Sequence, residues 1–440
     1  MNRSTPVGRT AGWACVALAV SAQAVSAQTL TLGAAADSAL ARHPAMGAAR
    51  ARLEAAAAGG DAARAAWLPA LTANGSATRF EEPMVVAPLH GFDPTDPPAF
   101  DRTLLQGQLA LDWTIFDGGA RGARVRGAEA AEGVAEAGVE ATAGELLEQV
   151  VGAYTGVLGA RALAAAAVRQ VAALEAERDH AEQRLQEGTA ARVEVLRAEA
   201  ALLDARAQAA TAEARVGLAE RTLARVMGAP VELLAGRPLA DVAPRSAPDP
   251  GVGTDGRIVA ARRAVDVARA RADRERAARL PRLGAGAGLQ SFGSGDGAHQ
   301  TEWQAGVRVS WPLFTGGARS AAIRSADAEL RAAEEELRRT DLAVAAERDA
   351  AEASVREAEA RARALEASVA QWEEVTRIEL LSLETGAGVQ QDYLRAEAAL
   401  FQARAGLARA RYDEIVARAS RARALGRLDR AWIDDALEVP

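Results

Sequence analysis

Two stretches decide the fold: Leu111-Asp-Trp-Thr-Ile-Phe-Asp-Gly-Gly-Ala-Arg121 and Val309-Ser-Trp-Pro-Leu-Phe-Thr-Gly-Gly-Ala-Arg319. Their tryptophans are 311 − 113 = 198 residues apart. The heptapeptide Leu-Arg-Ala-Glu-Ala-Ala-Leu occurs at 196–202 and again at 394–400, at the same offset. Loops absorb insertions readily, so a constant offset over this distance predicts rigid helices between the landmarks. The chain therefore reads as an internal duplication.

The duplication divides the 440 residues into two repeats. We expect a first repeat at 28–227, a connector at 228–253, a second repeat at 254–425 and a C-terminal tail at 426–440. The connector holds five prolines, which exclude a long helix. A Leu-Pro pair at 68–69 recurs at 280–281, an offset of 212, so the first repeat has 212 − 198 = 14 extra residues. These fall in a loop around Pro83, Pro88, Pro94, Pro97 and Pro98.

Each repeat contains a predicted β-hairpin, at 70–115 and 282–313. Residues 104–115 and 303–311 alternate between apolar and polar side chains, which is the period of a strand. Weaker alternation at 71–78 and 283–290 supplies the partner strands. Such strands, with apolar and polar faces, suit a membrane β-barrel. Three tryptophans near strand ends predict an interfacial aromatic belt: Trp113, Trp303 and Trp311.

Four strands cannot close a membrane barrel, because the minimum is about eight. Unpaired strand edges are not tolerated in lipid, so the barrel must be shared between chains. Two chains would give eight strands with a filled interior, and three would give twelve with a lumen. Only the arrangement of three chains would leave an open channel. After residue 30 we expect no run that approaches a membrane helix.

A long helical hairpin follows each β-hairpin, at 117–227 and 317–425. Residues 120–185 contain no proline, and at 1.5 Å per residue such a helix spans about 100 Å. Glycine-containing breaks at 187–189 and 384–386 precede the return helices. Helices of this length must project out of the membrane.

Residues 1–27 have the pattern of a secretory signal peptide, with Arg3 and Arg9 before an apolar run and a small-residue site before Gln28. Cys15 is the only cysteine and lies inside this leader. Acylation of Cys15 is disfavoured, because Gly12-Trp-Ala14 is a poor lipid-anchor approach. The mature chain would then have no thiol for a disulfide, a metal or catalysis.

The remaining composition argues against enzymes and nucleic-acid binding. The net charge of −7 provides no basic field. Gly251-Val-Gly-Thr-Asp-Gly256 matches a dinucleotide motif, but a proline-rich connector precedes it where a strand is needed. Thr254 and Asp255 more plausibly cap a helix. The four histidines are scattered. We expect no enzyme activity, cofactor or metal site.

The N-terminal stretch Leu30-Thr-Leu-Gly-Ala-Ala-Ala-Asp-Ser-Ala-Leu40, followed by His43-Pro44, resembles the mature start of TolC-like outer membrane efflux proteins. The Leu-Pro pair, the Trp-to-Gly-Gly stretch and the 188–196 turn are also similar to that family's repeat landmarks. The resemblance implies a mainly helical homotrimer, in which a 12-strand β-barrel continues into a 12-helix α-barrel. It also implies an outer-membrane location with the helices in the periplasm. The implied partners are a periplasmic adaptor and, through it, an inner-membrane pump of RND or ABC type.

The resemblance extends to individual residues at the helical tips. Gly188-Thr189 and Gly386-Ala387 match the family's adaptor-contacting tip turns. Asp392 matches an aspartate of the closed periplasmic entrance, and Glu194 is its counterpart in the first repeat. Two positions depart from the family: Arg395 replaces a second aspartate, and Gly388 replaces a basic residue. Asp392 and Arg395, three apart on a helix, can pair.

The leading hypothesis is a passive exit duct of a tripartite efflux pump or a type I secretion system. One alternative is the periplasmic adaptor itself, which needs one helical hairpin between soluble β-domains. Another is a structural coiled coil without a membrane part. Two hairpins, each joined to amphipathic strands, favour the duct. The sequence does not identify the cargo.

Overall fold

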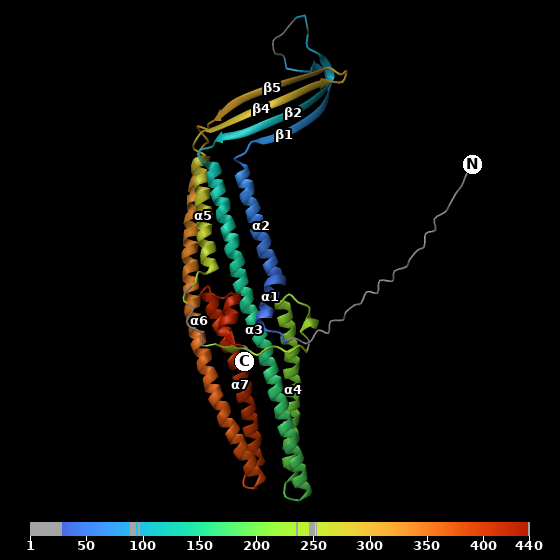
Figure 1. The fold of residues 1–440 in the computed structure, drawn as a ribbon, viewed down its shortest axis with the longest axis vertical. Helices are drawn as coiled ribbons and strands as arrows, with labels where there is room; N and C mark the ends of the chain where they lie inside the picture. Colours follow the sequence, from blue (N-terminus) through green and yellow to red (C-terminus); the bar gives the residue numbers. More distant parts are fainter. Residues whose placement is uncertain are drawn as a thin grey trace, which may run out of the picture.

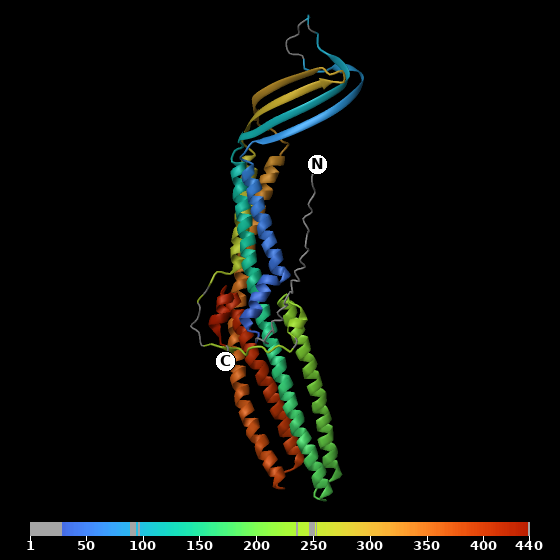
Figure 2. The ribbon, with the colours of Figure 1, turned by 45° about the vertical axis from the view of Figure 1, so that its right-hand side comes forward.

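The computed structural model describes residues 29–88, 94, 95, 97–234, 236–245, 251 and 253–438. The predicted leader and Cys15 lie outside the described residues. The described part is a long helical column with a curved four-stranded sheet at one end and two helical tips at the other (Figures 1 and 2).

The helices have matching lengths in the two repeats. α3 (Ala120–Gln186) and α6 (Ala318–Glu384) each have 67 residues, while α4 (Arg192–Val226) and α7 (Gln390–Ala424) each have 35. All four starts obey the 198-residue offset. α2 (Pro44–Ala65) and α5 (Gly256–Ala277) have 22 residues each, offset by 212. Asp255 accepts from the Arg257 amide and caps α5, so the glycine motif is a helix start.

The sheet has the order β1-β2-β4-β5 and is antiparallel throughout. Its strands are β1 (Ala70–Val85), β2 (Phe100–Phe116), β4 (Arg282–Ser294) and β5 (His299–Ser310). The first hairpin is longer than the alternation predicted. Pro83 lies inside β1, not in the predicted loop, at a register shift between Arg79 and Met84. Proline is tolerated there because the ladder is already interrupted.

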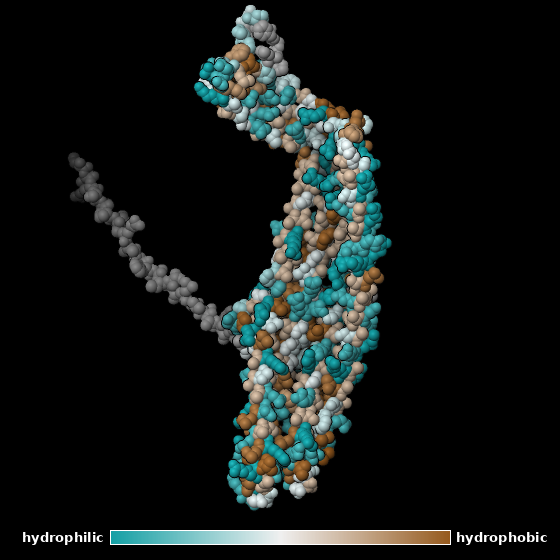
Figure 3. Space-filling view, turned by 180° about the vertical axis from the view of Figure 1, so that it is seen from behind, coloured by the Kyte–Doolittle hydropathy of each residue, from teal (hydrophilic) through white to brown (hydrophobic). Residues whose placement is uncertain are grey.

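Within the described residues, each of the two outer strands of the sheet has one edge that pairs with no other strand. β1 pairs only with β2, and β5 pairs only with β4. Figure 3 shows polar and apolar side chains mixed along the helical column, with apolar patches where the strands meet the helices and near the helical tips. Leu313 and Phe314, which follow β5, are 77% and 89% exposed.

The connector and tail form a band around the middle of the column. It contains the short elements η1 (Val231–Leu233), β3 (Ala243–Pro244), α8 (Arg430–Ala436) and β6 (Leu437–Glu438), and β3 pairs with β6. α1 (Leu32–Arg42) packs on α3 beside this band. Tyr154 of α3, fully buried, donates its hydroxyl to Ala240 O at 2.6 Å and Leu30 O at 2.8 Å. This side chain ties the N-terminus and the connector to the helix.

One expectation about the helices is wrong. α3 contains a window long and apolar enough to pass as a membrane span, although we expected none after residue 30. A third of that window is buried inside the chain. Val150, Val151 and Val157 of α3 are buried in the mid-column core, and a core helix meets the same criterion. The window is therefore weak support for a span.

We predict that Tyr154→Phe loosens the mid-column band. The change leaves the buried Ala240 carbonyl without its donor, which costs about 1–3 kcal/mol of unfolding free energy. Urea unfolding followed by circular dichroism measures this. Tyr412→Phe is the matched control, because that hydroxyl contacts Asp241 at 3.2 Å in an exposed position. Equal destabilisation by both variants would contradict the role of Tyr154.

Candidate functional site at the helical tips and strand ends

The two tip turns have the same backbone. Gly188 and Gly386 have φ of +78° and +76°, the left-handed region that favours glycine. Amides one residue later bond back to the helix, Thr189 N to Arg184 O and Ala387 N to Ser382 O, both at 2.9 Å. A Cβ at either glycine would meet nothing within 4 Å. The backbone angle, and not a steric clash, therefore favours glycine at both turns.

The predicted entrance acids occupy equivalent positions, each in the first turn of a return helix. Glu194 accepts from Ala191 N at 3.4 Å and lies 3.8 Å from Arg184 Nη1. Asp392 lies 3.7 Å from Arg395 Nη1, as the spacing suggested, and both side chains are more than half exposed. An acid in the first turn also stabilises its helix through the dipole. A single chain does not enclose a constriction around these residues.

The structure brings together a cluster near the tips that the sequence analysis missed. Glu177 of α3, 3% exposed, accepts from Gln390 Nε2 of α7 at 2.8 Å and from Arg184 Nη2 at 3.1 Å. This buried contact links the two helical hairpins. Glu177 lies at helical spacing from the buried Gln170, Leu174 and Ala181. The sequence offered one signal for this cluster, which is a charged residue at a position that helical spacing assigns to the buried face of α3.

A second buried acid lies two turns from the start of α7. Glu397 is 7% exposed, and burial raises the pKa of its carboxyl, with Arg404 opposing. Tyr393, one turn earlier, is also buried, which raises its pKa to about 12, with Glu397 and Glu177 adding to the effect. Of the two buried acids near the tips, Glu177 is therefore paired with Arg184, whereas burial disfavours the charged form of Glu397.

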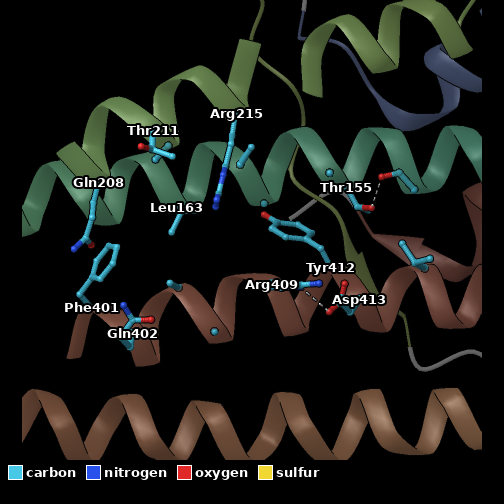
Figure 4. Close-up of a pocket in the computed structure, with 18 of the residues that line it drawn as sticks. Thr155, Leu163, Gln208, Thr211, Arg215, Phe401, Gln402, Arg409, Tyr412 and Asp413 are labelled. Carbon is cyan, nitrogen blue, oxygen red and sulfur yellow. Dashed lines mark hydrogen bonds and ion pairs between the residues drawn. The ribbon is translucent and has the colours of Figure 1, made fainter. Parts of the chain in front are cut away.

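A groove of 790 Å³ is lined by residues of α3, α4 and α7 (Figure 4). Its floor on α3 is built from small residues, among them Gly152, Gly156 and Gly159. Phe401 of α7 projects towards α4 and packs against Ala212. The hairpins consequently touch mainly through α3 and α7, and α4 meets α7 at few points, among them Phe401.

The predicted belt tryptophans differ in their contacts. Trp113 Nε1 donates to Trp67 O at 3.0 Å, and Trp311 Nε1 donates to Arg279 O at 3.1 Å. These two indoles thus join the end of a strand to the end of the preceding helix, in the same way in both repeats. Trp303, towards the other end of β5, is 79% exposed.

Comparison with known proteins identifies the chain. Its sequence matches the family described as outer membrane efflux protein over residues 35–229 and 255–427, which leaves out most of the connector. The chain belongs to the outer membrane efflux protein family. The predicted family and outer-membrane location are thereby confirmed.

Relatives of this efflux protein agree in fold. The sequence is 28% identical over 304 residues to the alkaline protease secretion protein AprF of Pseudomonas aeruginosa. That alignment covers 66% of this chain and 63% of AprF. The outer membrane protein VceC of Vibrio cholerae superposes with a TM-score of 0.79 at 21% identity, covering 90% of this chain and 96% of VceC. The MtrE outer membrane channel of Neisseria gonorrhoeae gives 0.72 at 20% identity, covering 91% and 90%.

We predict that Glu397→Gln stabilises the efflux protein at neutral pH. The raised pKa means that the fold favours the protonated carboxyl, so ionisation costs stability as pH rises above the unfolded value of about 4.3. Glutamine imitates the neutral form. The thermal midpoint should therefore rise at pH 7.5 and change little near pH 4.

Glu374→Gln provides a control of opposite sign. A hydrogen bond from Arg377 lowers the pKa of the exposed Glu374, so its removal should not stabilise the protein at pH 7.5. A fall in the Glu397→Gln midpoint at pH 7.5 would show that the carboxylate is favourably held.

Proposed function

We propose that this chain is one subunit of a trimeric exit duct, which passively conducts cargo from the periplasm through the outer membrane. Three copies would join their sheets into a 12-strand barrel and their helices into a 12-helix column. The observation that carries the proposal is the sheet with its two unpaired edges. Such edges must be closed by further strands in lipid.

The two repeats differ where a neighbouring chain would sit. A Cβ at Gly118 would lie 2.7 Å from Ala277 O and 2.8 Å from Leu280 Cβ, because the end of α5 packs there. A Cβ at the equivalent Gly316 would meet nothing within 4 Å. The 212-residue offset matches Leu280 to Leu68, which is 69% exposed. The end of α2 from a second chain would fill the space beside Gly316.

The duplication also predicts how the chains pair. Within the chain, β2 joins β4 with Asp112 opposite Gly286. The 198-residue offset relates position 112 of β2 to 112 + 198 = 310 of β5. The 212-residue offset relates position 286 of β4 to 286 − 212 = 74 of β1. Ser310 of one chain should therefore lie opposite Asn74 of the next. Directly opposed residues in an antiparallel pair have Cα atoms about 4.5–5.5 Å apart, which a disulfide can bridge.

We predict that Asn74→Cys combined with Ser310→Cys, with Cys15 replaced by alanine, gives a covalent trimer under oxidation. Non-reducing gel electrophoresis of the outer membrane fraction measures it. Asn74→Cys with Gln304→Cys is the control, because six residues displace the partners by about 20 Å. A covalent dimer as the largest product would support the eight-strand alternative instead. An equal yield of disulfide-linked trimer in the control would show that Ser310 does not lie opposite Asn74 of the next chain.

The tips are the proposed contact with other components. Gly188, Thr189, Gly386 and Ala387 would meet a periplasmic adaptor, which couples the duct to an inner-membrane pump of RND or ABC type. Both turns are exposed and have one backbone shape, so six equivalent tips would be presented by three chains. AprF is named for alkaline protease secretion, which favours a secreted protein as cargo.

The entrance is proposed to lie inside these tips. Three copies each of Asp392 and Glu194 would form an acidic ring that favours cations. Arg395 beside Asp392 and Arg184 beside Glu194 would weaken this field. The adaptor and coiled-coil alternatives are less well supported, because neither requires an open amphipathic sheet.

We predict that Asp392→Asn lowers the cation-to-anion permeability ratio in planar bilayers by about twofold, because it removes three charges near the pore axis. The reversal potential in a KCl gradient measures this. Asp413→Asn is the matched control on the same helix, since Asp413 lines the groove beside α4. If both variants shift the potential equally, Asp392 is not an entrance residue.

A further inference from the structure

Two arginines without partners lie together on the polar face of the sheet, near its helical end. Arg308 of β5 is opposite Gly284 of β4, and Arg282 of β4 is opposite Ser310 of β5. Both arginines are exposed, and neither forms an ion pair or hydrogen bond with any residue that the structure describes. Many helical arginines, by contrast, contact a carboxylate, as Arg161 contacts Glu220 at 2.6 Å.

A glycine floor makes room beside these arginines. The polar face contains a hollow of 680 Å³ that both arginines line. Its floor consists of backbone at Gly284, Gly286, Gly288 and Gly306. A Cβ at Gly306 would meet nothing within 4 Å. Asp112 Oδ1 lies 3.6 Å from the Cβ position of Gly286, so the Asp112 side chain leans over this floor. The hollow is therefore open, and charged side chains lie at its border.

The charge at this end of the sheet is positive. Asp112 is the acid on the same face, in the next register row from Arg308. Glu302 lies farther along β5 and accepts from the Gln300 side chain. β1 contributes no charge to this face from Ala70 to Thr78, where its side chains are Thr72, Asn74, Ser76 and Thr78. Each chain therefore places two arginines against one aspartate.

We propose that Arg282 and Arg308 form an anion-binding belt inside the barrel, selecting cargo that carries carboxylate or phosphate groups. The proposal rests on the proposed duct, since the polar face becomes a lumen only in the assembled barrel. Three chains supply six arginines and three aspartates. The repeat offsets place Ser76 of the next chain opposite Arg308, because 110 + 198 = 308 and 288 − 212 = 76. The neighbour thus adds no compensating acid.

Guanidinium groups suit this ligand class. The planar fork of arginine donates two parallel hydrogen bonds to a carboxylate or phosphate. In a water-filled lumen each contact is weak, and several weak sites let an anion enter and leave. The first repeat has Ala70 and Ala110 at the positions equivalent to Arg282 and Arg308. The belt is therefore a property of the second hairpin.

The test measures local potential with a single cysteine. Thr114 lies opposite Gly284, which separates it from Arg308 by one strand. Thr114→Cys, with Cys15 replaced by alanine, is reacted with the anionic reagent MTSES and the cationic reagent MTSET in detergent-purified protein. Arg282→Gln with Arg308→Gln should lower the ratio of anionic to cationic rates by about fivefold at 0.1 M salt.

Two controls separate charge from structure. Gln290→Cys lies on the same face, opposite Glu302 and six residues along β4 from Gly284, about 20 Å along the strand, and its ratio should change little. Arg79→Gln removes a positive charge from the other face of the sheet, at the position opposite Thr103, and should leave the Thr114→Cys ratio unchanged.

The outcomes distinguish the belt from the duct. An unchanged ratio at a reactive Thr114→Cys overturns the belt and leaves the duct intact. Failure of both Thr114→Cys and Gln290→Cys to react with either reagent shows that the polar face is not a lumen, which overturns the duct as well. A fall in the ratio confined to the double glutamine variant supports the belt.

Discussion

The reversal from strand to helix at the paired glycines is the constraint on which the rest of this fold depends. Gly118 and Gly119 both have positive φ, as do Gly316 and Gly317, and a residue with a Cβ adopts that region only at a cost of about 1–2 kcal/mol. Only three residues separate β2 from α3, so the strand sets the direction of that 67-residue helix, whereas seven residues separate β5 from α6. Asp117 accepts from the Gly119 and Arg121 amides and fixes the first turn further.

The first of these junctions is fixed by contacts that connect α3, β2 and the end of α2. Arg121 packs its guanidinium 4.3 Å from the Trp67 ring and donates to Ile115 O, which joins helix, strand and the preceding helix. In the second copy Thr315 replaces Asp117, and Arg319 donates to Pro312 O. The second junction is thus less self-contained, in keeping with a partner chain beside it.

The internal repeat allowed most of the architecture to be predicted from the sequence, because the length of a helix and the alternation of side chains along a strand are local properties. A proline-free run and constant offsets were enough to predict α3, α4, α6 and α7. The alternation of side chains also placed Arg308 on the polar face of its strand. The Glu177–Gln390 contact could not be predicted, since its residues are 213 positions apart and the meeting of α3 with α7 depends on packing. Arg282 joins Arg308 only through the register of β4 with β5.

The mid-column band breaks the equivalence of the repeats. Tyr154 holds the connector in the first repeat, while the matching position in the second is the exposed Glu352. The connector between the repeats and the tail after the second repeat therefore have no second copy. An assembly of three chains would be nearly sixfold in its strands and helices but threefold in this band.

The uninterrupted length of α3 makes it a mechanical lever. The helix is clamped at the glycine junction and again at mid-column, where its buried residues from Leu146 to Leu158 pack with α7 and the connector. Beyond Leu158 a further 28 residues reach the end of the helix, an arm of about 40 Å. A tilt of about 5° at the clamp would displace the end of that arm by about 3–4 Å, from the same helix rise. A modest strain at the band is thus magnified at the tip, with no hinge anywhere in the rod.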